Sequence, residues 1–183
     1  MRLPALLLGI AIAGWAQAPL KTAAITEPAV RPSGTPAPSF ESMSVLEKKL
    51  DAKITNSGAK DPFLLLGFAR VFYLPGFGAV ITQELSLVVT PVISPFQQTI
   101  THEQAVKVHE RKIAQLPLMK KVMRDIWTEA ATSLPTVPPT EQVVLALRLL
   151  YQPWEDTAGL PAQLVMRGPR NPALASTIVI EEQ

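Results

Sequence analysis

Two histidines, His102 and His109, are the first residues to consider for metal or acid–base chemistry, and the chain has no others. Their spacing places them on the same side of a helix but about 10.5 Å apart along its axis, too far for one metal ion. A general acid–base pair of His109 with Glu110 is also disfavoured, because adjacent helical residues do not face each other. We therefore expect no metal site and an ordinary solvated His109.

A second candidate is the carboxylate pair Glu155 and Asp156, which follows Trp154. Glycosidases hold their two carboxylates on separate elements across a cleft, so turn capping is the favoured interpretation here. No serine lies in a Gly-x-Ser-x-Gly motif. The chain has no cysteine, which excludes thiol catalysis, cysteine-bound metal and disulfides. We find no enzyme signature, and keep as the alternative function a hydrolase that acts on an envelope polymer through carboxylates.

The stretch YLPGFGAV, residues 73–80, raises the question of a phosphate-binding loop. Such loops lead into a helix, whereas here the alternating residues 79–89 predict a strand. Pro75 presets one backbone angle of a turn, and Gly76 and Gly78 can adopt positive φ. We therefore predict a β-hairpin and no bound cofactor. Phe77 at the hairpin tip and Trp154 in a later loop are candidate aromatic contacts for a partner.

Basic residues are concentrated between residues 107 and 124, although the whole chain carries a formal charge of only +2. This segment contains one acid, Glu110, and six basic residues: Lys107, Arg111, Lys112, Lys120, Lys121 and Arg124. On a helix Lys107, Arg111 and Lys121 lie opposite the apolar stripe and Arg124 flanks it, so these four are the candidate contacts for an anionic partner. The simpler interpretation is a solvated helix balanced by nearby acids. Lys112 does not fit either interpretation, because it falls near the apolar side.

The N-terminus has the pattern of a secretory signal peptide over residues 1–18. Arg2 precedes an apolar run over residues 3–12, which is shorter than the roughly 20 residues that cross a bilayer. Cleavage fits after Ala16 or Ala18, so we expect no transmembrane span in the mature protein. Residues 19–39 are rich in proline and read as an extended linker.

The remaining residues, 40–183, are long enough for one domain. A capping box at residues 44–47 predicts a short helix to about residue 54, and a second one at residues 101–104 predicts a long helix to about residue 133. Pro117 either kinks the long helix or begins another. Its apolar stripe, methionines included, is expected in the core: Ala105, Val108, Met119, Met123, Ile126 and Ala130.

Alternation over residues 143–151 favours a strand, with a helix as the alternative, and residues 160–167 read as the returning strand. The tail after residue 168 adds an edge strand or is loose. We thus predict an α+β two-layer sandwich. Its antiparallel sheet has four or more strands built from two hairpins, with a long kinked helix between them and a short N-terminal helix. The order of the strands is not readable, and a largely helical second half is the main alternative.

Three segments resemble those of an uncharacterised group of secreted bacterial proteins: YLPGFGAVITQELSLV, SPFQQTIT and WEDTAGLPAQLVM. The resemblance covers roughly residues 60–167 and implies an exported domain but no activity. From leader and composition we expect a periplasmic or secreted protein that binds an anionic envelope component or another envelope protein. Export separates such a protein from nucleic acid, so a nucleic-acid partner is not expected.

Overall fold

The computed structural model describes residues 37–58, 60–93, 95, 99–171 and 178–183. The expected signal peptide and most of the linker lie outside these residues. All described residues belong to one compact unit, Arg31–Gln183. None of the helices in this part of the chain is long and apolar enough to cross a membrane.

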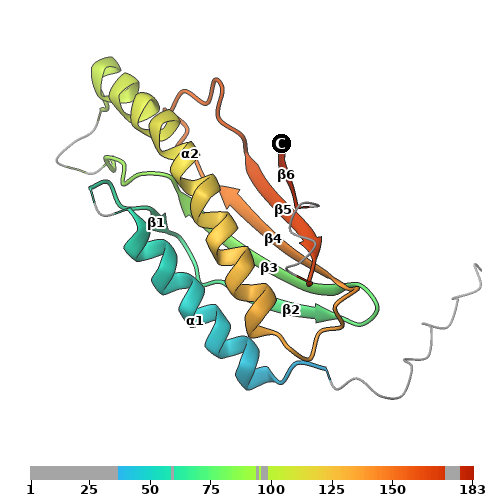
Figure 1. Ribbon diagram of the computed structural model, residues 1–183. Coiled ribbons are helices and arrows are strands. Elements are labelled where there is room, and N and C mark those ends of the chain that lie inside the picture. The colour runs from blue at the N-terminus through green and yellow to red at the C-terminus, as the bar shows by residue number, and fades with distance from the viewer. Residues whose placement is uncertain (1–36, 59, 94, 96–98, 172–177) are drawn as a thin grey trace, which may run out of the picture. The chain divides into compact units, whose positions relative to one another are not determined.

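The fold consists of two helices and a mixed sheet (Figure 1). In chain order its elements are α1 (Phe40–Ser57), β1 (Leu64–Leu65), β2 (Arg70–Leu74), β3 (Gly78–Ser86), α2 (His102–Ser133), β4 (Gln142–Leu149), β5 (Gln163–Pro169) and β6 (Val179–Glu182). The strands are ordered β1-β3-β4-β5-β6, and β2 also pairs with β3. The predicted α+β class, the long and the short helix, and the two hairpins β2–β3 and β4–β5 are confirmed.

One pairing differs from the expected antiparallel sheet, since β3 and β4 run parallel. The physical reason is the connection between them. Helix α2 carries the chain from the end of β3 back to its start, so β4 runs in the same direction as β3, as in a βαβ unit. The strand interpretation of residues 143–151 is confirmed by β4, and the expected edge strand in the tail is β6.

Helix α1 begins earlier than the sequence pattern predicted. The capping box at residues 44–47 is wrong, because Ser44 lies inside the helix and Ser39 is the N-cap. The Ser39 side chain accepts a hydrogen bond from the backbone N–H of Ser42 at 3.1 Å, which satisfies one free donor of the first turn. Leu46, Leu50 and Ile54 then recur at helical spacing and are buried.

Helix α2 starts at the predicted capping box. Gln104 N–H donates to the Thr101 hydroxyl at 3.2 Å, and Thr101 N–H donates to the Gln104 side chain at 2.9 Å. The helix continues through Pro117, which is exposed, so no second helix begins there. The predicted stripe is buried except for half-buried Ala105, and both of its methionines lie in the core.

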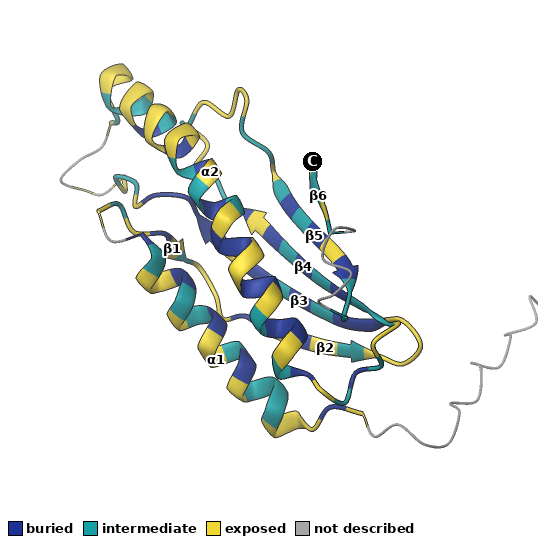
Figure 2. Cartoon of the chain, viewed as in Figure 1, coloured by how far each residue is buried: buried dark blue, intermediate teal, exposed yellow. Residues whose placement is uncertain are grey.

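The helices leave one face of the sheet uncovered. Helix α1 packs against β1 and β2, and α2 packs against β4 and β5, on the same side of the sheet (Figure 1). Under the helices, buried positions alternate with less buried ones along the central strands (Figure 2). The buried set includes Ile81, Leu85, Val143, Leu145, Leu164 and Met166. The alternate residues of these strands therefore form an uncovered surface, which we call the open face.

The stretch at residues 73–80 is the predicted hairpin turn. Phe77 N–H donates to the Leu74 carbonyl at 3.0 Å, and Gly76 (φ +80°) and Gly78 (φ +131°) both have positive φ. A Cβ at Gly78 would collide with the backbone of Gln142, whereas the space around Gly76 is free. Gly78 is thus required by the close approach of β3 to the start of β4 as well as by its backbone angle.

Candidate interaction surface

The open face presents apolar side chains in neighbouring strands. Across the sheet one row is formed by Phe72, Val80, Val144, Arg167 and Val179, each paired in register with the next. The exposed fraction is 52% for Phe72 and 46% for Val179. Exposed apolar residues that are contiguous mark contact surfaces more often than scattered ones do.

Two depressions hollow the open face on either side of this row. One, of about 480 Å³, is lined by Phe77, Val144 and Arg167 among others. The other, of about 420 Å³, includes Phe68 and Ala146. Since Val144 and Ala146 are successive residues on one face of β4, the two depressions follow each other along that strand.

Three arginines stand on the open face, and each has a carboxylate neighbour. Arg148 lies 3.2 Å from Glu84, Arg167 lies 2.5 Å from Glu181, and Arg70 lies 3.7 Å from Glu47. In every pair the arginine side chain is the more exposed member: 68% against 48%, 57% against 34%, and 59% against 20%. The arginine side chains are therefore more accessible to solvent than the glutamate side chains with which they pair.

The two aromatic residues singled out from the sequence lie at different places. Phe77 is 47% exposed and borders a depression of the open face. Trp154 is half-buried in the connection between β4 and β5, beyond the other end of β4. The Phe77 carbonyl accepts a hydrogen bond from Gln142 N–H at the start of β4, whereas Trp154 follows the end of this strand, so the fold does not bring the two rings together.

The four basic residues proposed for an anionic partner divide into two pairs. Lys107 bonds to Glu103 at 2.6 Å, and Arg111 donates to both carboxylate oxygens of Asp61, with Nε at 2.9 Å from Oδ2. Lys121 and Arg124 are exposed, and no carboxylate in the described residues pairs with them. Of the four basic residues that the sequence suggested for an anionic partner, only Lys121 and Arg124 therefore have no carboxylate partner among the described residues.

A buried ion pair between α2 and the β4–β5 connection was missed from the sequence. The side chains of Lys112 and Glu155, which are bonded to each other, are 1% and 2% exposed. Burial lowers the pKa of Lys112, and the hydrogen bond to Glu155 opposes this shift. The misfit of Lys112 on the apolar side of the helix was the available signal. Turn capping is correct for Asp156, which accepts from Ala158 N–H at 2.9 Å, and wrong for Glu155.

Tyr151 lies beside this pair. The Lys112 ammonium is 4.6 Å from the centre of the tyrosine ring, within cation–π range. The Tyr151 hydroxyl donates to the Pro161 carbonyl at 2.6 Å. Burial, with the nearby negative charge of Glu155, raises the pKa of Tyr151 to about 12. These contacts tie both ends of the β4–β5 connection to α2, as does His109, whose Nδ1 lies 3.0 Å from the Asp156 carbonyl oxygen.

Three carboxylates of the described residues, those of Glu41, Glu84 and Glu155, lie apart from one another. Glu41 and Glu84 lie in separate depressions, and Glu155 is bonded to Lys112. Among the described residues, no group of three or more histidine, aspartate or glutamate side chains is arranged to hold a metal ion. The two histidines lie in the first turns of α2, and His102 is exposed.

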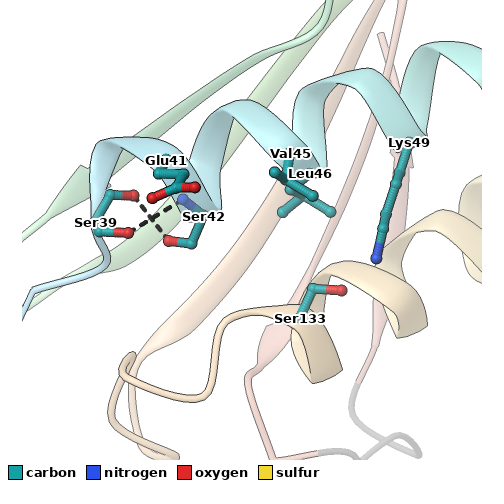
Figure 3. Close-up of a pocket in the computed structure, with 7 residues that line it drawn as sticks. All are labelled: Ser39, Glu41, Ser42, Val45, Leu46, Lys49 and Ser133. Atoms are coloured by element: carbon teal, nitrogen blue, oxygen red, sulfur yellow. Dashed lines mark hydrogen bonds between the residues drawn. The ribbon is translucent and has the colours of Figure 1, made fainter.

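A third depression, of about 420 Å³, lies between the start of α1 and the end of α2 (Figure 3). Some of its polar groups are hydrogen-bonded to one another. Ser42 donates from its N–H to the Ser39 side chain and from its hydroxyl to the Ser39 carbonyl at 2.8 Å. Glu41 in the same turn opposes an anion there, so the N-terminus of α1 is not a ready anion site.

Comparison of the chain with protein-family models, curated proteins and solved structures found no match. The resemblance of residues 60–167 to secreted bacterial proteins stays a prediction, and no functional residue is transferred to this chain.

Proposed function

We propose that this protein is an exported, non-catalytic binding protein that holds a partner on the open face of its sheet. The observation that carries the proposal is the row across this face, which contains four apolar side chains and Arg167, is exposed at both ends, and has depressions beside it and aromatic rings at its border. Phenylalanine and arginine are enriched at interfaces over other surface residues, which suits this composition. A sheet face with depressions offers a surface on which a partner can bind.

The expected leader at residues 1–18 supports export to the periplasm or the outside of the cell. The proline-rich segment after it then allows the domain to reach a partner at the envelope. A partner in the envelope, either a protein or an anionic component, is consistent with this location. Nucleic acid is not expected there.

A hydrolase of an envelope polymer is the alternative, and the positions of the carboxylates do not favour it. Both glycosidase mechanisms require two carboxyl groups across one cleft, about 5–10 Å apart. Glu41 and Glu84 lie in different depressions, and the Glu155 side chain is closed off from solvent. The described residues therefore support binding better than hydrolysis.

Because the chain has no natural cysteine, a single introduced cysteine can carry a chemical probe at a chosen position. A photo-crosslinker is attached to Leu74→Cys on the open face or to Ala52→Cys on the exposed side of α1, and each protein is mixed with envelope extract of the source cell. We expect a discrete crosslinked product from position 74 only, and its loss when Phe72→Ser is added. Since Phe72 is half exposed, Phe72→Ser should keep the melting temperature nearly unchanged. Equal crosslinking at both positions, or a product that survives Phe72→Ser, would contradict the proposal.

A further inference from the structure

We infer that the partner offers an extended polypeptide segment with acidic and apolar side chains, lying along β4 on the open face. This inference rests on the proposed function and adds the chemistry of the partner. It follows from three properties of the surface. They are the size of the side chains along its floor, the exposure of its arginines, and the hydrogen bonds that already engage the backbone N–H groups at the β2 edge of the sheet.

The floor of the open face is made of small side chains and its border of large ones. Thr82 and Ala146 pair in register at the centre, with Val144 next along β4. Phe68, Phe77 and the arginines stand around them. The floor along β4 from residue 142 to 148 is about 20 Å long, which matches roughly six residues of extended chain. Such a segment can place apolar side chains in both depressions.

The charge at the border favours an acidic segment. The side chains of Arg70, Arg148 and Arg167 are each more exposed than the glutamate side chain beside them, and Arg70 and Arg148 line one depression while Arg167 lines the other. A partner carboxylate can therefore reach an arginine without displacing its internal neighbour, and arginine binds carboxylates through two parallel hydrogen bonds. A basic segment would meet these guanidinium groups first and be repelled.

The sheet edge beside β2 is closed to an added strand. The backbone N–H groups of Ala69 and Val71 donate to the side chains of Asp51 and Glu47 on α1, each at 2.9 Å. These donors would be needed to pair with a partner strand at this edge. Binding across the face leaves both bonds intact. This favours the face over the β2 edge as the place of the segment.

Two segments of this chain outside the described residues do not have the required composition. Residues 19–36 contain Lys21 and Arg31 against Glu27, so they carry no negative excess. Residues 172–177 contain no charged side chain. Their composition favours a segment of another protein as the occupant.

The test measures binding of short fluorescent peptides, each about eight residues long, to the full mature chain. One peptide is built from leucine and glutamate, one from leucine and lysine, and one from serine and glutamate; a single-stranded oligothymidylate is the fourth probe. We expect the leucine–glutamate peptide to bind most tightly. The double variant Arg148→Gln with Arg167→Gln removes two exposed positive charges and should lower the affinity for this peptide about tenfold. The loss of affinity should be smaller at high salt.

The matched control removes the same charge elsewhere. Lys121→Gln with Arg124→Gln changes two exposed, unpaired cations on α2 and should leave peptide binding unchanged. If the leucine–lysine peptide binds as tightly and Phe72→Ser abolishes both, the open face binds but the acidic assignment is overturned. If no peptide binding responds to Phe72→Ser, the proposed function itself fails. Tighter binding of the oligothymidylate than of any peptide would overturn a polypeptide partner.

Discussion

The buried pair of Lys112 and Glu155 allows the sharpest test of the fold. We predict that Glu155→Leu and Lys112→Met each destabilise the domain by about 3–5 kcal/mol, because each leaves one charge buried without its partner. The double variant should unfold within about 1 kcal/mol of the wild type or be more stable, because it replaces both charges by apolar groups of similar size. Equilibrium unfolding in urea measures all three changes.

The magnitude follows from the burial of the two side chains, 1% and 2% exposed. In Glu155→Leu, Lys112 retains only the Leu150 carbonyl at 3.4 Å and the ring of Tyr151. The lysine can then lose its proton, which for an ordinary pKa of 10.5 costs about 5 kcal/mol at pH 7. That value sets an upper limit.

The variant Glu155→Leu should become more stable as the pH rises. In this variant the folded-state pKa of Lys112 falls further below that of the unfolded chain, so stability rises as pH rises toward 10.5. Unfolding at pH values of about 5, 7 and 9 measures this slope.

The control is an exposed pair of the same residue types on the same helix. Lys107 and Glu103 are 66% and 78% exposed, and their equivalent substitutions should change stability by about 0.5 kcal/mol or less. A double variant of Lys112 and Glu155 that loses as much as the sum of the two single variants would refute the reasoning, because uncoupled residues add. So would single variants that lose no more than the control.

Three further predictions concern other parts of the domain. Gly76→Ala should cost about 1 kcal/mol through its backbone angle alone, whereas Gly78→Ala should cost more than about 3 kcal/mol, because it also separates two strands; thermal unfolding compares them. The pKa of Tyr151 is higher in the folded than in the unfolded chain, so raising the pH from 10 to 12 should remove about 1 kcal/mol of stability. This value is smaller than the pKa difference alone would give, because the side chain is partly exposed. The variant Tyr151→Phe should abolish the loss, as urea titrations at alkaline pH would measure. If α2 binds an anionic surface, Lys121→Gln with Arg124→Gln should weaken sedimentation with anionic vesicles at low salt; equal sedimentation would leave this side as ordinary solvated surface.

Local signals predicted the parts of the fold that depend on neighbours in the chain. Thr101 and Gln104 satisfy each other's backbone within one turn, so the start of α2 was readable. The hairpin turn was readable for the same reason, because Gly76 and Gly78 act on their own backbone angles. At α1 the predicted cap was Ser44, whereas the N-cap of the packed helix is Ser39, five residues earlier.

Contacts between distant residues were not readable. Lys112 and Glu155 are 43 positions apart, and the pattern showed only that Lys112 was misplaced on its helix. The parallel pairing of β3 with β4 depends on the path of α2 over the sheet, which alternation in either strand does not encode. Alternation did predict that each strand has two unlike faces. It could not show that the less buried faces of separate strands join into one surface.

Within the described residues, neither helix covers the open face. Both helices lie on the other side of the sheet, and α1 is held at the β2 edge by bonds from Glu47 and Asp51. Helix α2 is held through Lys112 and through Trp127, whose ring N–H donates to the Val143 carbonyl at 2.8 Å. Neither helix can cross to the open face without breaking these bonds. Arginine side chains can lay their apolar stems on neighbouring apolar residues and keep their charged ends in water, so the arginines of this face lower the cost of leaving its apolar residues exposed to solvent.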